Sequence, residues 1–109
     1  MIIALVAGCS SDRRLTLGDG ITLQRLPEGG RLPQAIVDDT GAVHVVYFEG
    51  ESRAGDLRYV QLSPGGSTWS EPKVVNSQAG TVVGIGPIDG GQVALGKDGR
   101  LHVVWVKLG

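Results

Sequence analysis

Two histidines, His44 and His102, are the side chains best suited to acid–base chemistry or metal binding, because histidine titrates near neutral pH and is a common metal ligand. They are the two histidines of the sequence, and they lie 58 positions apart. Gly41 and Gly99 have the same separation. We therefore expect both histidines to hold the same place in two copies of one unit, packed between sheets with a hydrogen-bonded ring nitrogen. Neither is expected to be catalytic, and we predict no metal site and no cofactor.

The elements that position these histidines form an internal repeat. Residues 92–105, QVALGKDGRLHVVW, are similar in sequence to residues 34–47, QAIVDDTGAVHVVY, and matching positions are always 58 residues apart. Such a period indicates one supersecondary unit used again, and units of this kind bury their apolar faces only by stacking on neighbours. Fewer than two periods of 58 fit in 109 residues. We therefore interpret the chain as a piece of a larger repeat protein, which alone would be aggregated, oligomeric or partly unfolded.

One unit is predicted to be a four-stranded antiparallel meander. Residues 34–37 and 43–48 flank the turn sequence Asp-Asp-Thr-Gly and form a hairpin. The second of these strands is apolar on both faces except at His44, which is typical of a strand covered on both sides. After a polar loop at 49–55, residues 57–62 alternate with period two and predict a third strand. A fourth strand is predicted at 72–75, starting with a proline.

The fold class predicted from these elements is all-β. The chain has 18 glycines and five prolines and no apolar stripe of helical period. Four-stranded antiparallel units repeated radially are the blades of a β-propeller. We predict a fragment of a propeller, with about one full blade, the inner hairpin of the next, and a lone strand at 21–26 that would close the ring. An immunoglobulin-like sandwich is the alternative, but it does not explain the repeat.

The composition argues against nucleic acid as a partner. The net charge is −1, with ten basic and eleven acidic residues, and no basic cluster is larger than Arg13-Arg14. A single cysteine, Cys9, excludes a disulfide within the chain.

The segment around Cys9 resembles the end of a bacterial lipoprotein signal, with Val6-Ala7-Gly8-Cys9 as its lipobox. The resemblance implies cleavage before Cys9, a lipid on its thiol, and export to the cell envelope, at the outer membrane or cell surface. Membrane contact would then come only through this lipid. Residues 1–8 would be a truncated signal, 9–19 a linker and 20–109 the propeller segment. No Lys or Arg precedes the short apolar run, so the alternative is a frayed N-terminal strand with a buried cysteine.

A second resemblance concerns residues 62–69, LSPGGSTW. They resemble the Asp-box of sialidase-like proteins, Ser-x-Asp-x-Gly-x-Thr-Trp, at Gly66, Thr68 and Trp69. They depart from it at Leu62, which stands for the serine, and at Pro64, which stands for the aspartate that braces the turn. The resemblance implies a propeller with this box between the third and fourth strands of a blade. Such a box reports fold and not chemistry.

The motif Arg31-Leu32-Pro33 resembles the Arg-Ile-Pro or Arg-Leu-Pro motif of the first sialidase blade, and the similarity extends over about residues 30 to 76. It implies that Arg31 binds the carboxylate of sialic acid through two parallel hydrogen bonds. Asp56 is the nearby candidate for the general acid, with Glu51 as a substitute; the alternative for Asp56 is a solvated loop residue. In the family, the tyrosine nucleophile, its glutamate partner and the other arginines come from later blades, so we expect residues 1–109 to be inactive alone.

These observations predict an incomplete sialidase-like, Asp-box repeat propeller. The parent would be an exported protein that binds glycans or hydrolyses them as an exo-sialidase, with a sialylated or other carbohydrate as its partner. The alternative is a non-catalytic propeller that serves as a surface binding or scaffold module.

Overall fold

The computed structural model describes residues 2–6, 21–85 and 90–107, and for residues 2–6, 21 and 22 it describes the backbone alone. Cys9 and the expected linker 9–19 lie outside the described residues. The described chain is all-β, with one 3₁₀ turn, η1 (Lys97–Gly99). Its strands are β1 (Ile2–Val6), β2 (Ile21–Arg25), β3 (Arg31–Val37), β4 (Val43–Glu51), β5 (Ala54–Leu62), β6 (Lys73–Val74), β7 (Gly91–Leu95) and β8 (Leu101–Trp105).

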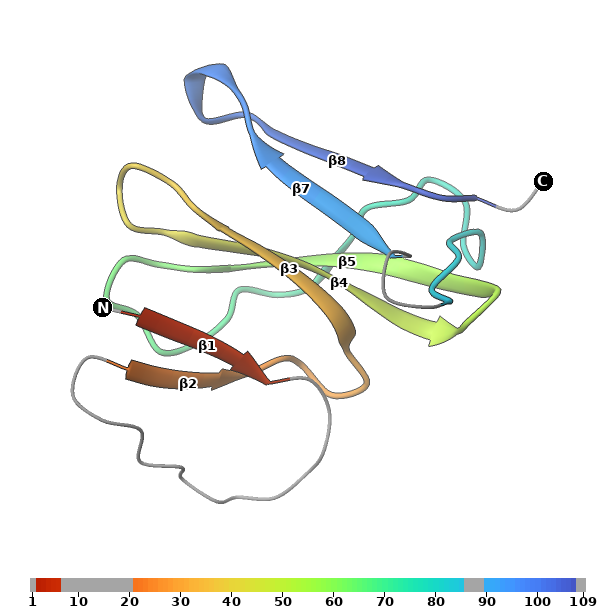
Figure 1. Cartoon of the computed structure of the whole chain (residues 1–109), viewed down its shortest axis with the longest axis horizontal. Helices are drawn as coiled ribbons and strands as arrows, with labels where there is room; N and C mark the ends of the chain where they lie inside the picture. Colours follow the sequence, from red (N-terminus) through yellow and green to blue (C-terminus); the bar gives the residue numbers. More distant parts are fainter. Residues whose placement is uncertain (1, 7–20, 86–89, 108–109) are drawn as a thin grey trace.

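The central sheet has the order β3-β4-β5-β6 with every neighbouring pair antiparallel, so the predicted meander is confirmed. It lies between the β1–β2 pair and the β7–β8 hairpin (Figure 1). The prediction of a lone strand at 21–26 is wrong, because β1 pairs with β2 in parallel. Ile2–Val6 is a short run rich in apolar and β-branched residues, which have high strand propensity.

β4 is the centre of the fold, and its residues 43–48 are all buried, as expected for a strand that is apolar on both faces. Alternate side chains enter two clusters. The lower face, toward β2 in Figure 1, carries Leu26, Val43, Val45, Tyr47, Val60 and Leu62, with Trp69 packed against them. The upper face, toward β7, carries Phe48, Leu57 and Val82, with Leu32, Val75 and Val103 packed against them. The middle of the central sheet, at β4, is therefore buried on both sides, while β6 at its edge is exposed.

The turn between β4 and β5 is shorter than the sequence predicts. Where a loop at 49–55 was expected, the strands continue until Glu51 pairs with Ala54. Gly50 and Gly55, which face each other across the pair, permit this. Gly50 has φ +107°, and a side chain on Gly55 would overlap the ring of Phe48.

The internal repeat is confirmed at the level of strand register. Four of the five pairs of β7–β8 equal pairs of β3–β4 shifted by 58 positions; the fifth, Gly91↔Trp105, falls where the register of β3–β4 shifts between Arg31 and Gln34. The hydrogen bonds that close the two turns also correspond, since Asp38 N donates to Ala42 O at 3.0 Å and Gly96 N donates to Arg100 O at 2.6 Å. The corresponding pairs are Gln34↔Val46 and Gln92↔Val104, Ala35↔Val45 and Val93↔Val103, Ile36↔His44 and Ala94↔His102, and Val37↔Val43 and Leu95↔Leu101.

Candidate functional site

Arg31 is the first residue of β3, and the Arg-Leu-Pro motif forms a β-bulge there. Arg31 pairs with Phe48 and Gln34 with Val46, so β3 uses three residue steps where β4 uses two. Leu32 has a positive φ of 53°, and the bulge accommodates Pro33, which lacks a backbone donor. The bulge therefore sets where the Arg31 side chain leaves the sheet.

The guanidinium of Arg31 is held by two kinds of contact. Its Nη2 donates to Gly50 O at 2.7 Å and lies 3.4 Å from Ser52 Oγ. Its Cζ lies 4.7 Å from the centroid of the Phe48 ring, a cation–π contact. Among the described residues, Nε and Nη1 have no hydrogen-bond partner. Arg31 is thus a partly exposed cation in a defined position with donors left for an anion.

Asp56 lies in β5 and closes the loop that follows β6. Its Oδ1 accepts hydrogen bonds from Asn76 Nδ2 and from Gly80 N, each at 2.9 Å. Asn76 is buried, and its Oδ1 accepts from Leu57 N at 2.9 Å. The pKa of Asp56 is lowered, mainly because the Asn76 amide and then the Gly80 N–H donate to its ionised form.

This environment opposes the role of general acid, which needs a raised pKa to keep its proton at neutral pH. Nor is Asp56 a solvated loop residue, the alternative weighed above, because it is half-buried within a strand. Glu51, the suggested substitute, is exposed at the end of β4. The structure gives Asp56 a clear role in holding the 76–80 loop.

His44 is buried with both ring nitrogens satisfied. Nε2 donates to Asp38 Oδ2 at 2.8 Å, and Nδ1 lies 2.7 Å from the hydroxyl of Tyr59. The rings of His44 and Tyr59 are stacked. Asp38 Oδ1 also accepts from Thr40 N at 2.9 Å and from Ala42 N at 3.0 Å. These donors, the His44 side chain foremost, hold the pKa of Asp38 well below its usual range.

His102 has the register of His44 but not its environment. It is exposed, and the position that corresponds to Asp38 is Gly96, where a side chain would overlap the His102 ring. The expectation that both histidines share one role is therefore wrong: the buried, hydrogen-bonded environment expected for both is found for His44 and not for His102. Sequence reasoning missed Asp38 and Tyr59 as partners of His44. The replacement of Asp38 by Gly96 in the second copy could have indicated that the two histidines have different partners.

The segment 62–69, which resembles an Asp-box, runs from the end of β5 toward β6, the position that the resemblance implied. Its turn is closed by Gly66 N, which donates to Ser63 O at 2.8 Å. Trp69 packs on the lower face, and its Nε1 donates to Arg25 O at 2.6 Å. The box therefore joins the central sheet to β2 and contributes to packing.

In the described part of the chain, no three His, Cys, Asp or Glu side chains are grouped so that they could hold a metal ion. Within residues 2–6, 21–85 and 90–107, no helix is long and apolar enough to cross a membrane. No protein-family model, curated protein or solved structure matches this chain. Among the described residues, Arg31 is the strongest candidate for binding a ligand, because its guanidinium is held in place by Gly50 and Phe48.

Proposed function

We propose that the chain is part of a sialidase-like, Asp-box repeat β-propeller and that Arg31 binds the carboxylate of an acidic glycan. Three features support the propeller assignment: the four-stranded meander, the hairpin that repeats its register, and the stacking of that hairpin on the upper face. In this proposal the central sheet is one blade and β7–β8 is the inner hairpin of the next. A lipid on Cys9 would hold the protein at the cell envelope.

The observation that carries the binding function is the fixed guanidinium of Arg31. The Gly50 carbonyl and the Phe48 ring restrain it, so little side-chain freedom would be lost when an anion binds. Its planar fork can donate two parallel hydrogen bonds to a carboxylate, which a lysine cannot reproduce. Sialic acid is the sugar that the resemblance implies as the source of this carboxylate.

For the chain itself we favour binding over hydrolysis. Sialoside hydrolysis needs a general acid and an activated nucleophile next to the carboxylate clamp. Asp56 has a lowered pKa and is committed to Asn76 and Gly80. This observation supports the alternative of a non-catalytic binding or scaffold module, while exo-sialidase activity would belong to a longer parent that brings the remaining groups.

The test is an NMR titration of the chain with sialyllactose, with neutral lactose as the ligand control. We expect chemical shifts to move at Arg31, Gly50 and Ser52 with sialyllactose and not with lactose. Arg31→Lys, which keeps the charge and loses the fork, should weaken binding at least about tenfold. Arg53→Ala, which removes an exposed arginine from the β4–β5 turn, is the matched control and should bind like the wild type.

Equal shifts with lactose, or equal affinity in Arg31→Lys and the wild type, would refute carboxylate recognition by Arg31. A chain that binds neither sugar would favour the scaffold alternative.

A further inference from the structure

One nitrogen of the Arg31 guanidinium, Nη2, already has two acceptors within the chain. It donates to Gly50 O at 2.7 Å and to Ser52 Oγ at 3.4 Å. A guanidinium has two edges that can donate parallel hydrogen bonds to a carboxylate, one formed by Nε and Nη2 and the other by Nη1 and Nη2. Both edges include Nη2. A carboxylate can therefore accept two parallel bonds from Arg31 only after one of the present acceptors has left.

Of these two acceptors, the Ser52 hydroxyl is the one that can leave. Gly50 O is a backbone atom in a strand, where Gly50 pairs with Gly55, and its bond to Arg31 is short. The bond to Ser52 is long for a hydrogen bond, and Ser52 is exposed in the β4–β5 turn. Gly84 N donates to Ser52 O at 2.7 Å, which holds the backbone of the turn. Rotation about the Cα–Cβ bond of Ser52 is then enough to release Nη2.

The Ser52 oxygen accepts in this contact, because arginine has hydrogen-bond donors and no acceptor. A neutral oxygen thus lies where one oxygen of a bound carboxylate would lie. Hydrogen bonds between a guanidinium and a carboxylate are charge-assisted on both sides and are stronger than a bond to a hydroxyl. A ligand carboxylate can therefore replace Ser52 on Nη2.

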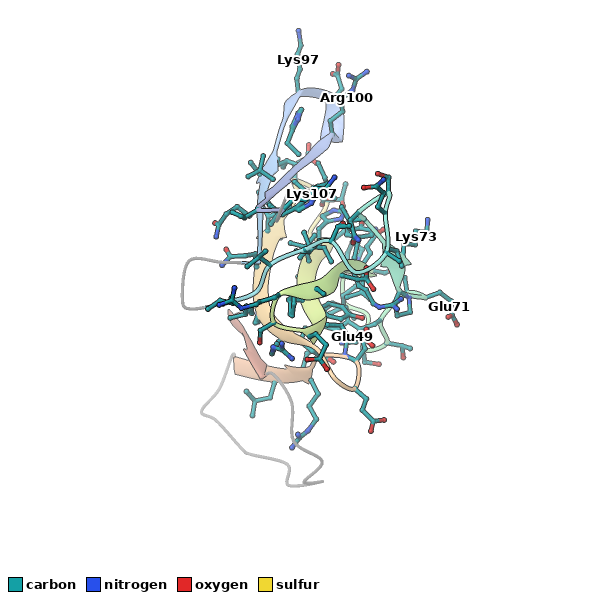
Figure 2. The ribbon with its side chains drawn as sticks, turned by 90° about the vertical axis from the view of Figure 1, so that its right-hand side faces the viewer. Glu49, Glu71, Lys73, Lys97, Arg100 and Lys107 are labelled. Carbon is teal, nitrogen blue, oxygen red and sulfur yellow. The ribbon has the colours of Figure 1, made fainter. Side chains whose placement is uncertain are left out.

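The acidic side chains of this end of β4 do not occupy that place. Figure 2, in which the β4–β5 turn faces the viewer, shows Glu49 just below the turn, and its Oε2 contacts Nε of Arg58. Glu51 is exposed at the end of β4. Among the described residues, the acceptors of Arg31 are the Gly50 carbonyl and the Ser52 hydroxyl. The second position on Nη2 is consequently held by a neutral group alone.

We propose that Ser52 is an internal competitor at the Arg31 site: its hydroxyl occupies Nη2 in the free chain and leaves it when the carboxylate of an acidic glycan binds. This inference rests on the proposed binding of a carboxylate by Arg31. Ser52 then limits the affinity for ligands that use an edge of the guanidinium. A neutral sugar hydroxyl, which accepts a single bond from Nε or Nη1, does not need to displace it.

The test is the NMR titration with sialyllactose, applied to Ser52→Ala and Ser52→Thr. Ser52→Ala removes the competitor and should tighten binding about two- to fivefold, because the net strength of such a hydrogen bond is modest. Ser52→Thr keeps a hydroxyl and should bind like the wild type. Neither variant should gain binding of neutral lactose. In an Arg31→Lys background, Ser52→Ala should give no gain, because lysine has no planar edge to release.

The side chain of Ser52 gives a second measurement, made in the wild type. Its Hα–Hβ couplings report the rotamer about the Cα–Cβ bond. They should change when the chain is saturated with sialyllactose and should stay the same with lactose.

The outcomes separate this inference from the proposed function. If sialyllactose binds in a way that depends on Arg31 but Ser52→Ala binds it equally or more weakly, Ser52 is no competitor and only this inference is overturned. If neither the wild type nor Ser52→Ala binds sialyllactose, both the proposed function and this inference are wrong.

Discussion

His44 donates a hydrogen bond from Nε2 to Asp38 across 2.8 Å, and this contact joins the start of β4 to the turn that precedes it. Asp38 uses its other oxygen to accept from the Thr40 and Ala42 amides, so one carboxylate orders both the turn and the imidazole. Tyr59 completes the network from β5. The second hairpin forms the corresponding closing bond, from Gly96 N to Arg100 O, without a side-chain partner at position 96, so this bond does not require the network.

Replacement of Asp38 should change how stability depends on pH. Its folded pKa is lowered from 3.8, so its ionised form stabilises the fold above about pH 4, and this contribution is lost as the pH falls toward the folded value. Asp38→Asn should therefore be less stable than the wild type at pH 7, and the gap should narrow below pH 4. Urea unfolding at a series of pH values measures the gap; a gap that is independent of pH would contradict this role.

The two histidines provide a matched pair of substitutions. His44→Ala leaves the half-buried Tyr59 hydroxyl and the Asp38 carboxylate with fewer partners and should lower the free energy of unfolding by about 1–3 kcal/mol. His102→Ala removes an exposed side chain and should change it by less than about 0.5 kcal/mol. Chemical denaturation of both variants tests this. Equal losses would mean that the network around His44 contributes little.

Asp56→Ala should reduce stability without affecting glycan binding. The buried Asn76 amide loses one of its two acceptors and keeps Gln78 O, the Gly80 amide loses its bond to Asp56, and we expect the free energy of unfolding to fall by about 1–3 kcal/mol. Asp56→Asn retains one oxygen acceptor and should recover part of the lost stability. No form of residues 1–109 is expected to cleave a fluorogenic sialoside, because Asp56 is not poised as an acid. Wild-type activity that disappears in both variants would restore Asp56 as the general acid.

Processing at Cys9 would have a structural consequence. A mature form beginning at Cys9 lacks β1, so β2 loses its parallel neighbour. Its amides at 21–25 should exchange faster with solvent than those of the full chain, while β4 and β5 should be unaffected. Mass spectrometry of the native protein should show a lipid on Cys9; an uncleaved, unmodified N-terminus would exclude the lipoprotein hypothesis.

Local pattern was sufficient for much of the fold. β3, β4 and β5 were predicted from three local features: the alternation at 57–62, the Asp-Asp-Thr-Gly turn, and the run at 43–48 that is apolar on both faces. Local features suffice here because strand periodicity and turn preference act between residues close in the chain. The constant spacing of the repeat predicted that β7–β8 would copy the first hairpin. The first strand was predicted at 34–37, whereas β3 begins three residues earlier, at Arg31.

Contacts between distant residues decided the rest. Three of these contacts join segments at least 15 positions apart: β2 pairs with β1, Asp56 binds Asn76, and His44 packs against Tyr59. The same histidine motif is buried in β4 and exposed in β8, since burial depends on the strands that pack beside it. The sequence by itself therefore determined which segments become strands and how the repeat is spaced. The tertiary structure decided which side chains are buried, paired or open, because desolvation and hydrogen-bond partners come from neighbours that the local pattern does not specify.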